Sequence, residues 1–114
     1  MIDWNRSDSL RAEIGPEDFR EVVELFLEEV DEVVMRLRLA PDPARFEEDL
    51  HFLKGSALNL GFTALGDLCA QGEREAAAGR PIAVDIAAVI ALYEASKQAF
   101  LARAMPRLSN PLCS

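Results

Sequence analysis

Apolar residues recur at steps of three and four along most of the chain, which is the periodicity of one face of an α-helix. The longest such stripe lies in residues 17–39, where glutamate and arginine fill the opposite face. Its apolar members are Phe19, Val22, Val23, Phe26, Val30, Val33, Val34 and Leu37. No segment of useful length alternates between apolar and polar residues with a period of two, so the pattern predicts helices and no sheet.

Proline and glycine divide this helical pattern into blocks. Pro16 suits the first turn of the first long helix, and Gly61 marks a break or a bend. A short helix before Pro16 could be capped by Ser7 or Asp8. The predicted helices cover about residues 7–14, 17–39, 43–60, 62–78 and 82–105. Amphipathic helices with short connections predict an all-α fold, an antiparallel four-helix bundle with a short extra N-terminal helix.

Length and charge narrow the classes of function. The 114 residues make one domain, which we place at residues 1–105, followed by an irregular C-terminal tail at 106–114. Twelve basic and twenty acidic residues give a formal net charge of −8, without a cluster of Lys and Arg, so we expect no binding to nucleic acid or to an anionic membrane surface. The longest uncharged stretch, residues 55–66, is too short to span a membrane.

The two cysteines do not indicate a disulfide framework. Cys69 falls in an apolar helical pattern, where a buried free thiol is usual, and Cys113 lies in the predicted tail. The first residues of the chain lack the apolar stretch of a signal peptide. We therefore expect a reducing, cytoplasmic environment.

The chain has one histidine, His51, which lies off the apolar stripe of its predicted helix. That stripe is centred between Leu50, Leu53 and Ala57, and at 100° per residue His51 lies about 140° from the centre. It should therefore face water. Any chemistry that needs an imidazole must use this residue, and one histidine with two cysteines is too few for a usual closed zinc site.

The neighbours of His51 on this outward face would make physical sense together as a site. Gly55, one turn later, leaves space beside the ring, although glycine within a helix costs about 1 kcal/mol relative to alanine. Lys54 supplies a cation for an anion held on the ring. Leu58, together with Phe62, offers an apolar patch to a partner protein. A phosphoryl group on a ring nitrogen would use all of these features.

The residues from His51 to Gly61, HFLKGSALNLG, resemble the signature of the histidine-containing phosphotransfer (HPt) domain family, approximately His-x-Leu-Lys-Gly-Ser-Ser/Ala-x-x-Leu-Gly. The resemblance covers about residues 5–104, and the stretch at 18–28 looks like stand-alone bacterial members. It implies a monomeric four-helix bundle whose exposed histidine accepts a phosphoryl group from the aspartate of one receiver domain and passes it to another. Such domains have no kinase activity and bind no nucleotide.

The resemblance also implies roles for single residues. His51 would be the phosphoacceptor through the ring nitrogen farther from the backbone, Lys54 would pair with the phosphoryl oxygens, and Gly55 would provide clearance. Glu73, where the family often has Gln or Glu, could accept the N–H of the other ring nitrogen or be an ordinary solvated charge. Gly72 departs from the family pattern, which usually has a larger apolar residue there, and could loosen or bend its helix.

The partners that the resemblance implies are receiver domains of response regulators, with a hybrid histidine kinase as a further candidate. The receiver is expected to bring Mg²⁺, because the chain offers no evident magnesium site and needs no cofactor of its own. Ser56 matches the family pattern and is expected to pack or hydrogen-bond within the helices. The candidate docking residues are Ala44, Glu47, Glu48, Leu58 and Phe62.

Three other interpretations stay open. The phosphoacceptor domain of a sensor kinase also has a helical histidine, but an acidic residue usually follows it directly, where this chain has Phe52. A degenerate helical bundle could act only as an adaptor. A metal-binding bundle would need inward Glu-x-x-His pairs, and the one such sequence, residues 48–51, is predicted to point outward.

Overall fold

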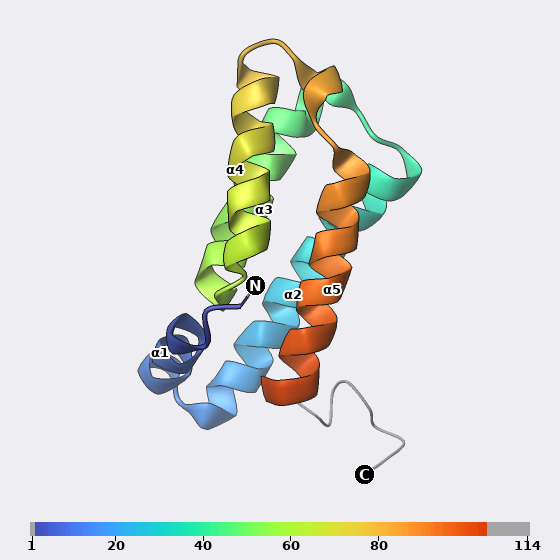
Figure 1. Ribbon diagram of the computed structural model, residues 1–114. Helices are drawn as coiled ribbons and strands as arrows, with labels where there is room; N and C mark the ends of the chain where they lie inside the picture. The colour runs from blue at the N-terminus through green and yellow to red at the C-terminus, as the bar shows by residue number, and fades with distance from the viewer. Residues whose placement is uncertain (1, 105–114) are drawn as a thin grey trace.

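The computed structural model describes residues 2–104, and this range contains helices and no strand. Its elements are α1 (Trp4–Ile14), α2 (Pro16–Leu39), η1 (Pro43–Arg45), α3 (Phe46–Leu60), α4 (Thr63–Ala77), η2 (Pro81–Ala83) and α5 (Ile86–Ala104), where η marks a 3₁₀ helix. The helices α2 to α5 lie along the long axis of the molecule, and α1 lies at one end beside the α3–α4 turn (Figure 1). The all-helical fold is as predicted, while the predicted tail and Cys113 lie outside the described residues.

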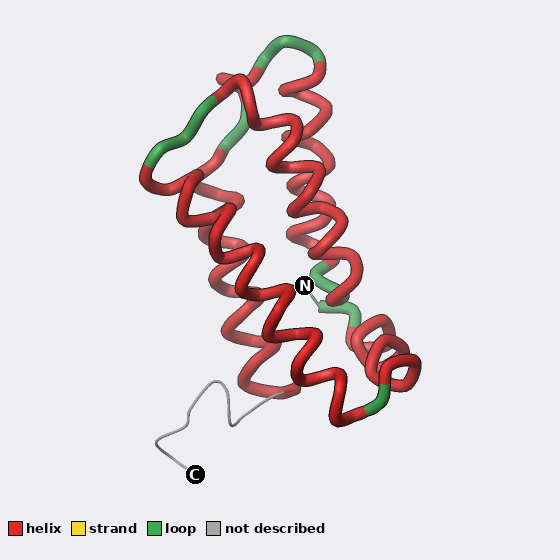
Figure 2. The backbone as a smooth tube through the Cα atoms, turned by 180° about the vertical axis from the view of Figure 1, so that it is seen from behind, coloured by secondary structure: helices red, strands yellow, loops and turns green. Residues whose placement is uncertain are grey.

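Figure 2 shows the same helices from behind, joined by short connections. The core stripe predicted for α3 is confirmed, since Phe46, Leu50, Leu53, Ala57 and Leu60 are all buried. The stripe of α2 is rotated slightly from the predicted one. Its buried residues are Phe19, Val23, Leu27, Val30, Val34 and Leu37. Three predicted core residues of α2 are only partly buried: Val22, Phe26 and Val33.

The first helix starts earlier than predicted. It begins at Trp4 because the residue that caps it is Asp3. Neither of the predicted caps, Ser7 and Asp8, has this role. The Asp3 carboxylate accepts hydrogen bonds from two backbone amides of the first turn, at 3.1 Å from Asn5 and 3.3 Å from Arg6. A side-chain acceptor before the first turn is the usual way to satisfy such free donors. Ser7 is instead buried within the helix.

Aromatic contacts fix α1 against the end of α5. The Trp4 ring stacks on Phe100 with centroids 5.9 Å apart, and the Arg103 guanidinium lies 4.4 Å from the centroid of the Trp4 ring. Stacked rings and a cation over an aromatic face are both attractive arrangements. The backbone N–H of Asp3 donates to the carbonyl of Gly61 at 2.6 Å, which ties α1 to the α3–α4 turn.

That turn and its contact with α1 both require glycine at position 61. Gly61 has φ +85°, in the left-handed region that side chains other than glycine rarely adopt. A Cβ there would also collide with the carbonyl oxygen of Asp3. The residue therefore ends α3 and lets the backbone of the N-terminal segment approach the turn.

Two later helices also start at other residues than predicted. The segment predicted as one helix over 43–60 is a 3₁₀ turn at Pro43–Arg45 followed by α3. The segment predicted over 82–105 also begins with a 3₁₀ turn, and α5 starts only at Ile86. Val84 is extended, and the Asp85 carboxylate accepts from the backbone N–H of Ala88 at 2.9 Å. Asp85 thus provides the cap that the proline-glycine pattern does not locate.

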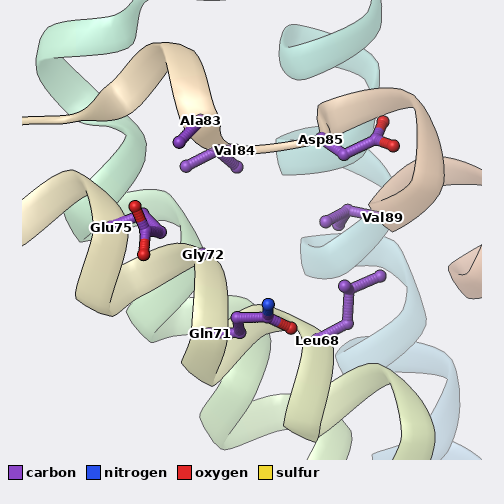
Figure 3. Close-up of a pocket in the computed structure, with 8 residues that line it drawn as sticks. All are labelled: Leu68, Gln71, Gly72, Glu75, Ala83, Val84, Asp85 and Val89. Atoms are coloured by element: carbon purple, nitrogen blue, oxygen red, sulfur yellow. The ribbon is translucent and has the colours of Figure 1, made fainter.

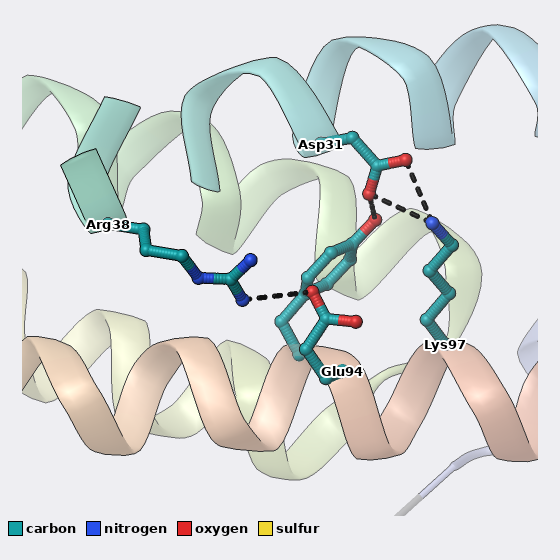
Figure 4. A network of polar contacts seen from close by, with 5 residues as sticks. Asp31, Arg38, Glu94 and Lys97 are labelled. Carbon is teal, nitrogen blue, oxygen red and sulfur yellow. Dashed lines mark hydrogen bonds and ion pairs between the residues drawn. The ribbon is translucent and has the colours of Figure 1, made fainter. Parts of the chain in front are cut away.

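An ion-pair network joins α2 to α5 on the side shown in Figure 4. Asp31 accepts from the Tyr93 hydroxyl at 2.5 Å and from Lys97 Nζ at 2.8 Å. Arg38 and Glu94 add a longer contact of 3.4 Å between the same helices. Burial and the neighbouring Asp31 carboxylate raise the pKa of Tyr93, so its hydroxyl remains a donor. These contacts fix the register of α5 against α2.

Gly72 does not interrupt its helix, and the expectation that it loosens or bends the helix stays a prediction. α4 runs unbroken from Thr63 to Ala77. A Cβ at Gly72 would lie 2.9 Å from Leu50 Cδ1 and 3.2 Å from Val84 Cγ1. Gly72 lines a hollow between α4 and the segment that leads into α5 (Figure 3). Its lack of a side chain lets two neighbouring elements approach closely.

This packing predicts opposite effects of alanine at two helical glycines. Gly72→Ala should lower the free energy of unfolding by about 1–2 kcal/mol, because the cost of overpacking exceeds the gain in helix propensity. A Cβ at Gly55, by contrast, meets nothing within 4 Å. Gly55→Ala should therefore raise the free energy of unfolding by about 0.5–1 kcal/mol. Urea unfolding followed by circular dichroism measures both values, and equal changes at the two sites would contradict the close packing at Gly72.

Candidate functional site

His51 lies on the outer face of α3. Its side chain is 70% exposed, whereas Leu50 and Leu53 on the same helix are buried. The outward direction predicted from the helical phase is therefore confirmed. The ring is accessible to another protein, while its backbone is held by a helix that is packed on both α2 and α4.

One carboxylate connects the imidazole to the nearby ammonium. Glu73, on α4, has Oε2 2.9 Å from His51 Nδ1 and Oε1 2.7 Å from Lys54 Nζ. His51 and Lys54 are three residues apart and share one face of α3. The Glu73 side chain is only 20% exposed, whereas the His51 side chain is 70% exposed. The carboxylate is therefore enclosed between α3 and α4, while the ring remains open to solvent.

The charge of Glu73 determines which ring nitrogen is left for chemistry. The Lys54 ammonium, opposed in part by burial and aided by His51, holds the pKa of Glu73 below its usual value. An ionised carboxylate can only accept hydrogen bonds, so Nδ1 of His51 is the donor in this contact. In a neutral ring the other nitrogen, Nε2, then carries the free lone pair.

The surface beside the ring is open. A side chain at Gly55 would begin in space that holds no atom within 4 Å. A shallow hollow on the other side is lined by Ala44, Glu47, Glu48, His51 and Glu73. Three of the candidate docking residues therefore share one surface with the histidine. Their part in docking stays a prediction.

The two apolar docking candidates differ in the structure. Leu58 is 47% exposed and lies over Gly66 of α4, where a Cβ would be 2.8 Å from Leu58 Cδ2. Phe62 is wrong as a docking residue, because it is 1% exposed and packs edge-on against Phe100 at 5.5 Å. The helical phase of α3 does not continue past Gly61, where the positive φ turns the chain inward.

Two buried polar residues support the site from below. Ser56 is buried, as its expected packing role requires. Asp49 is 4% exposed and pairs with Arg36 of α2, a contact that the sequence did not suggest. The sequence does contain a signal for this ion pair, because Asp49 is a charged residue on the apolar stripe of α3 and such a residue needs a partner when it is buried. Asp49 lies two residues before His51, and its ion pair with Arg36 fixes this part of α3 against α2.

Cys69 is the buried free thiol that the sequence predicted. Burial, and then the nearby Glu73 carboxylate, raises the pKa of its thiol to about 12. The thiol is therefore protonated at neutral pH and does not compete with His51 as a nucleophile. Within residues 2–104 no group of three or more His, Cys, Asp and Glu side chains could hold a metal ion. No helix of the described range is long and apolar enough to cross a membrane.

The comparison with protein-family models identifies the class. The model described as "Hpt domain" matches residues 21–104, which include all of α3, α4 and α5 and the part of α2 from residue 21 onward. The chain belongs to the Hpt domain family. Hpt domains are phosphocarrier modules that act in histidine phosphotransfer within phosphorelays, where they interact with receiver domains and kinases. Neither the search of curated proteins nor that of solved structures found a match to this chain.

The contact between Lys54 and Glu73 predicts a pH-dependent contribution to stability. Because the folded pKa of Glu73 is lowered, its ionised form stabilises the fold above the unfolded pKa, and this contribution is lost as the pH falls through the folded pKa. Lys54→Met should therefore cost about 1 kcal/mol at pH 7 and much less at about pH 3. Urea unfolding at both pH values measures the difference.

The control for this variant is Arg20→Met. Arg20 pairs with Glu24 at 3.4 Å on the exposed face of α2, with both side chains about half exposed. Its removal should change little at either pH, because exposed pairs contribute little. A loss of stability in Lys54→Met that does not depend on pH would instead assign the effect to packing of the lysine stem.

Proposed function

We propose that this protein is a histidine phosphotransfer protein that relays a phosphoryl group between the aspartates of receiver domains, with His51 as the phosphoacceptor. One observation carries the proposal: the exposed imidazole of His51 has Nδ1 at 2.9 Å from the Glu73 carboxylate, which directs the reactive lone pair to Nε2. We propose further that the helices form an antiparallel four-helix bundle with α1 as an extra element, and that the protein acts as a cytoplasmic monomer.

The proposed reaction needs little from this chain beyond positioning and charge. Nε2 attacks the phosphorus of an aspartyl phosphate in line, and the P–O bond breaks with its electron pair going to the aspartate oxygen. The side chain of Lys54 is 29% exposed. It would pair with the phosphoryl oxygens, and Gly55 would leave room for them. The receiver would supply the aspartate and Mg²⁺, so this chain needs no cofactor and no kinase activity of its own.

The proposed docking surface surrounds His51 and extends from the outer face of α3 to η1. It consists of Ala44, Glu47, Glu48 and Leu58, of which the first three line the hollow beside the ring. Leu58 adds an exposed apolar contact one turn beyond Gly55. The partners would be receiver domains of response regulators or of a hybrid histidine kinase.

The acidic character of this surface favours a protein partner over a free anion. The chain has a net charge of −8, and the hollow beside the ring is itself lined by Glu47, Glu48 and Glu73. A free anionic phosphodonor would react slowly there and only at high concentration, whereas a receiver domain would bring its phosphoryl group together with a divalent cation. The charge of Lys54 is matched by Glu73 until a phosphoryl group arrives.

The first prediction of this proposal concerns the acceptor. Incubation with a phosphorylated receiver domain should transfer an acid-labile, base-stable label to the wild type, and His51→Gln should abolish this label. Because the chain has one histidine, a phosphohistidine label can come only from His51, and its loss in His51→Gln identifies the acceptor. Labelling of His51→Gln at the wild-type level would refute the relay. Binding of the receiver without any label on the wild type would favour the alternative of a non-catalytic adaptor.

The second prediction concerns docking. Leu58→Asp should weaken binding of the receiver at least tenfold, since it places a charge in an apolar contact that becomes buried in the complex. The matched control is Leu25→Asp on α2, because Leu25 is 57% exposed and the change adds the same charge elsewhere. Titration calorimetry measures both affinities, and circular dichroism checks that both variants stay helical. Equal affinities would remove Leu58 from the docking surface.

A further inference from the structure

The acceptor that Glu73 presents to the ring carries a full negative charge. Its Oε2 lies 2.9 Å from Nδ1 of His51, and its Oε1 is 2.7 Å from the ammonium of Lys54. A glutamine at the same position could also accept the Nδ1–H hydrogen bond and orient the ring, but without a charge. Orientation of the ring alone therefore does not require a carboxylate, and the charge needs a separate explanation.

The charge matters most once the ring has taken up a phosphoryl group. When Nε2 of a neutral ring forms its bond to phosphorus, the ring still holds the proton on Nδ1 and so gains a positive charge. A carboxylate in contact with Nδ1–H stabilises this cation, just as a buried aspartate stabilises the imidazolium in a Ser-His-Asp triad. Glu73 is in the position of that aspartate.

The same proton determines how readily the phosphoryl group leaves. When an acceptor carboxylate attacks phosphorus, the P–N bond breaks and its electron pair returns to Nε2. If Nδ1 still carries its proton, the group that leaves is a neutral imidazole. If Nδ1 has lost the proton, the leaving group is an imidazolate anion, which is a far stronger base and leaves far more slowly.

We propose that Glu73 is a positioning residue whose charge keeps the Nδ1 proton on the phosphorylated ring of His51, so that onward transfer continues at alkaline pH. This rests on the proposed function and adds a role for the charge of Glu73 in the phosphorylated state. Before a phosphoryl group arrives, Lys54 holds the other oxygen of Glu73, and this contact aims the carboxylate at the ring.

The other ionisable groups around the ring are more distant from Nδ1. Glu47 and Glu48, on α3, line the hollow beside His51. On α4, Cys69 is near Glu73 and Lys54, but its thiol is buried and protonated. Glu47 therefore provides a matched control, because Glu47→Gln removes one negative charge from the same hollow without removing the acceptor of Nδ1–H.

The first experiment observes the proton directly. Wild type, Glu73→Gln and Glu47→Gln are labelled with ¹⁵N-histidine and phosphorylated with phosphoramidate, which needs no partner protein. His51 is the only histidine, so the spectrum reports this ring alone. The Nδ1–H form should persist to a pH about one unit higher in wild type and Glu47→Gln than in Glu73→Gln, a tenfold difference in proton affinity. Equal titration in wild type and Glu73→Gln overturns the proposal.

The second experiment measures single-turnover transfer from phosphorylated His51 to a receiver domain between about pH 6 and pH 9. The ratio of the wild-type rate to the Glu73→Gln rate should rise about tenfold across this range, and titration of the receiver cancels in the ratio. A constant ratio overturns the proposal. Failure of the wild type to transfer at any pH, with the expected ¹⁵N result, would refute the relay function and leave the role of Glu73 intact.

The proposal can still be tested if Glu73→Gln does not fold. If Glu73→Gln lost its helical circular dichroism, Glu73→Asp would replace it in both experiments. The aspartate keeps the charge but withdraws it from Nδ1 by one methylene group. It should therefore shift the ¹⁵N titration in the same direction as glutamine, by a smaller amount, and an unchanged titration overturns the proposal.

Discussion

The distance between α3 and α4 determines whether the Glu73 carboxylate can reach the ring of His51. Two glycines of α4 face leucines of α3 at places where a Cβ would be too close: Gly66 under Leu58, at 2.8 Å, and Gly72 against Leu50, at 2.9 Å. With no side chain at these positions, α4 can lie close against α3. Glu73 follows Gly72 directly, so its short side chain reaches both His51 and Lys54 across the narrow gap.

The direction of His51 could be predicted from the sequence because it depends on one helix only. A period of 3.6 residues and a clear apolar stripe suffice to place a side chain on the outer face of α3. The contact of His51 with Glu73 depends on how two helices pack, and helical phase carries no information on that distance. For that reason the sequence leaves Glu73 as either a ring partner or a solvated charge, and only the packed structure places it at the ring.

The differences between the sequence prediction and the structure have local physical causes. Phe62 falls on the surface only if the phase of α3 continues through Gly61, but a residue with positive φ ends a helix and changes the direction of the chain. The start of α1 is hard to place because Asp3, a good cap, precedes residues without a strong apolar period. Asp49 looks like an exception on an apolar stripe, since its partner Arg36 comes from another helix.

Gly72 connects the packing of the helices to the chemistry of the ring. A larger side chain there would have to displace Leu50 or move α4 away from α3. Movement of α4 would lengthen the contact between Glu73 and Nδ1, and an ion at a hydrogen-bonding distance loses its effect steeply as it withdraws into solvent. The hydrogen bond from Nδ1–H would be lost first, and the electrostatic effect of the carboxylate on the ring would weaken as the distance grows. The glycine at 72 and the glutamate at 73 are therefore best understood as one feature, in which the first residue sets the distance at which the second can act.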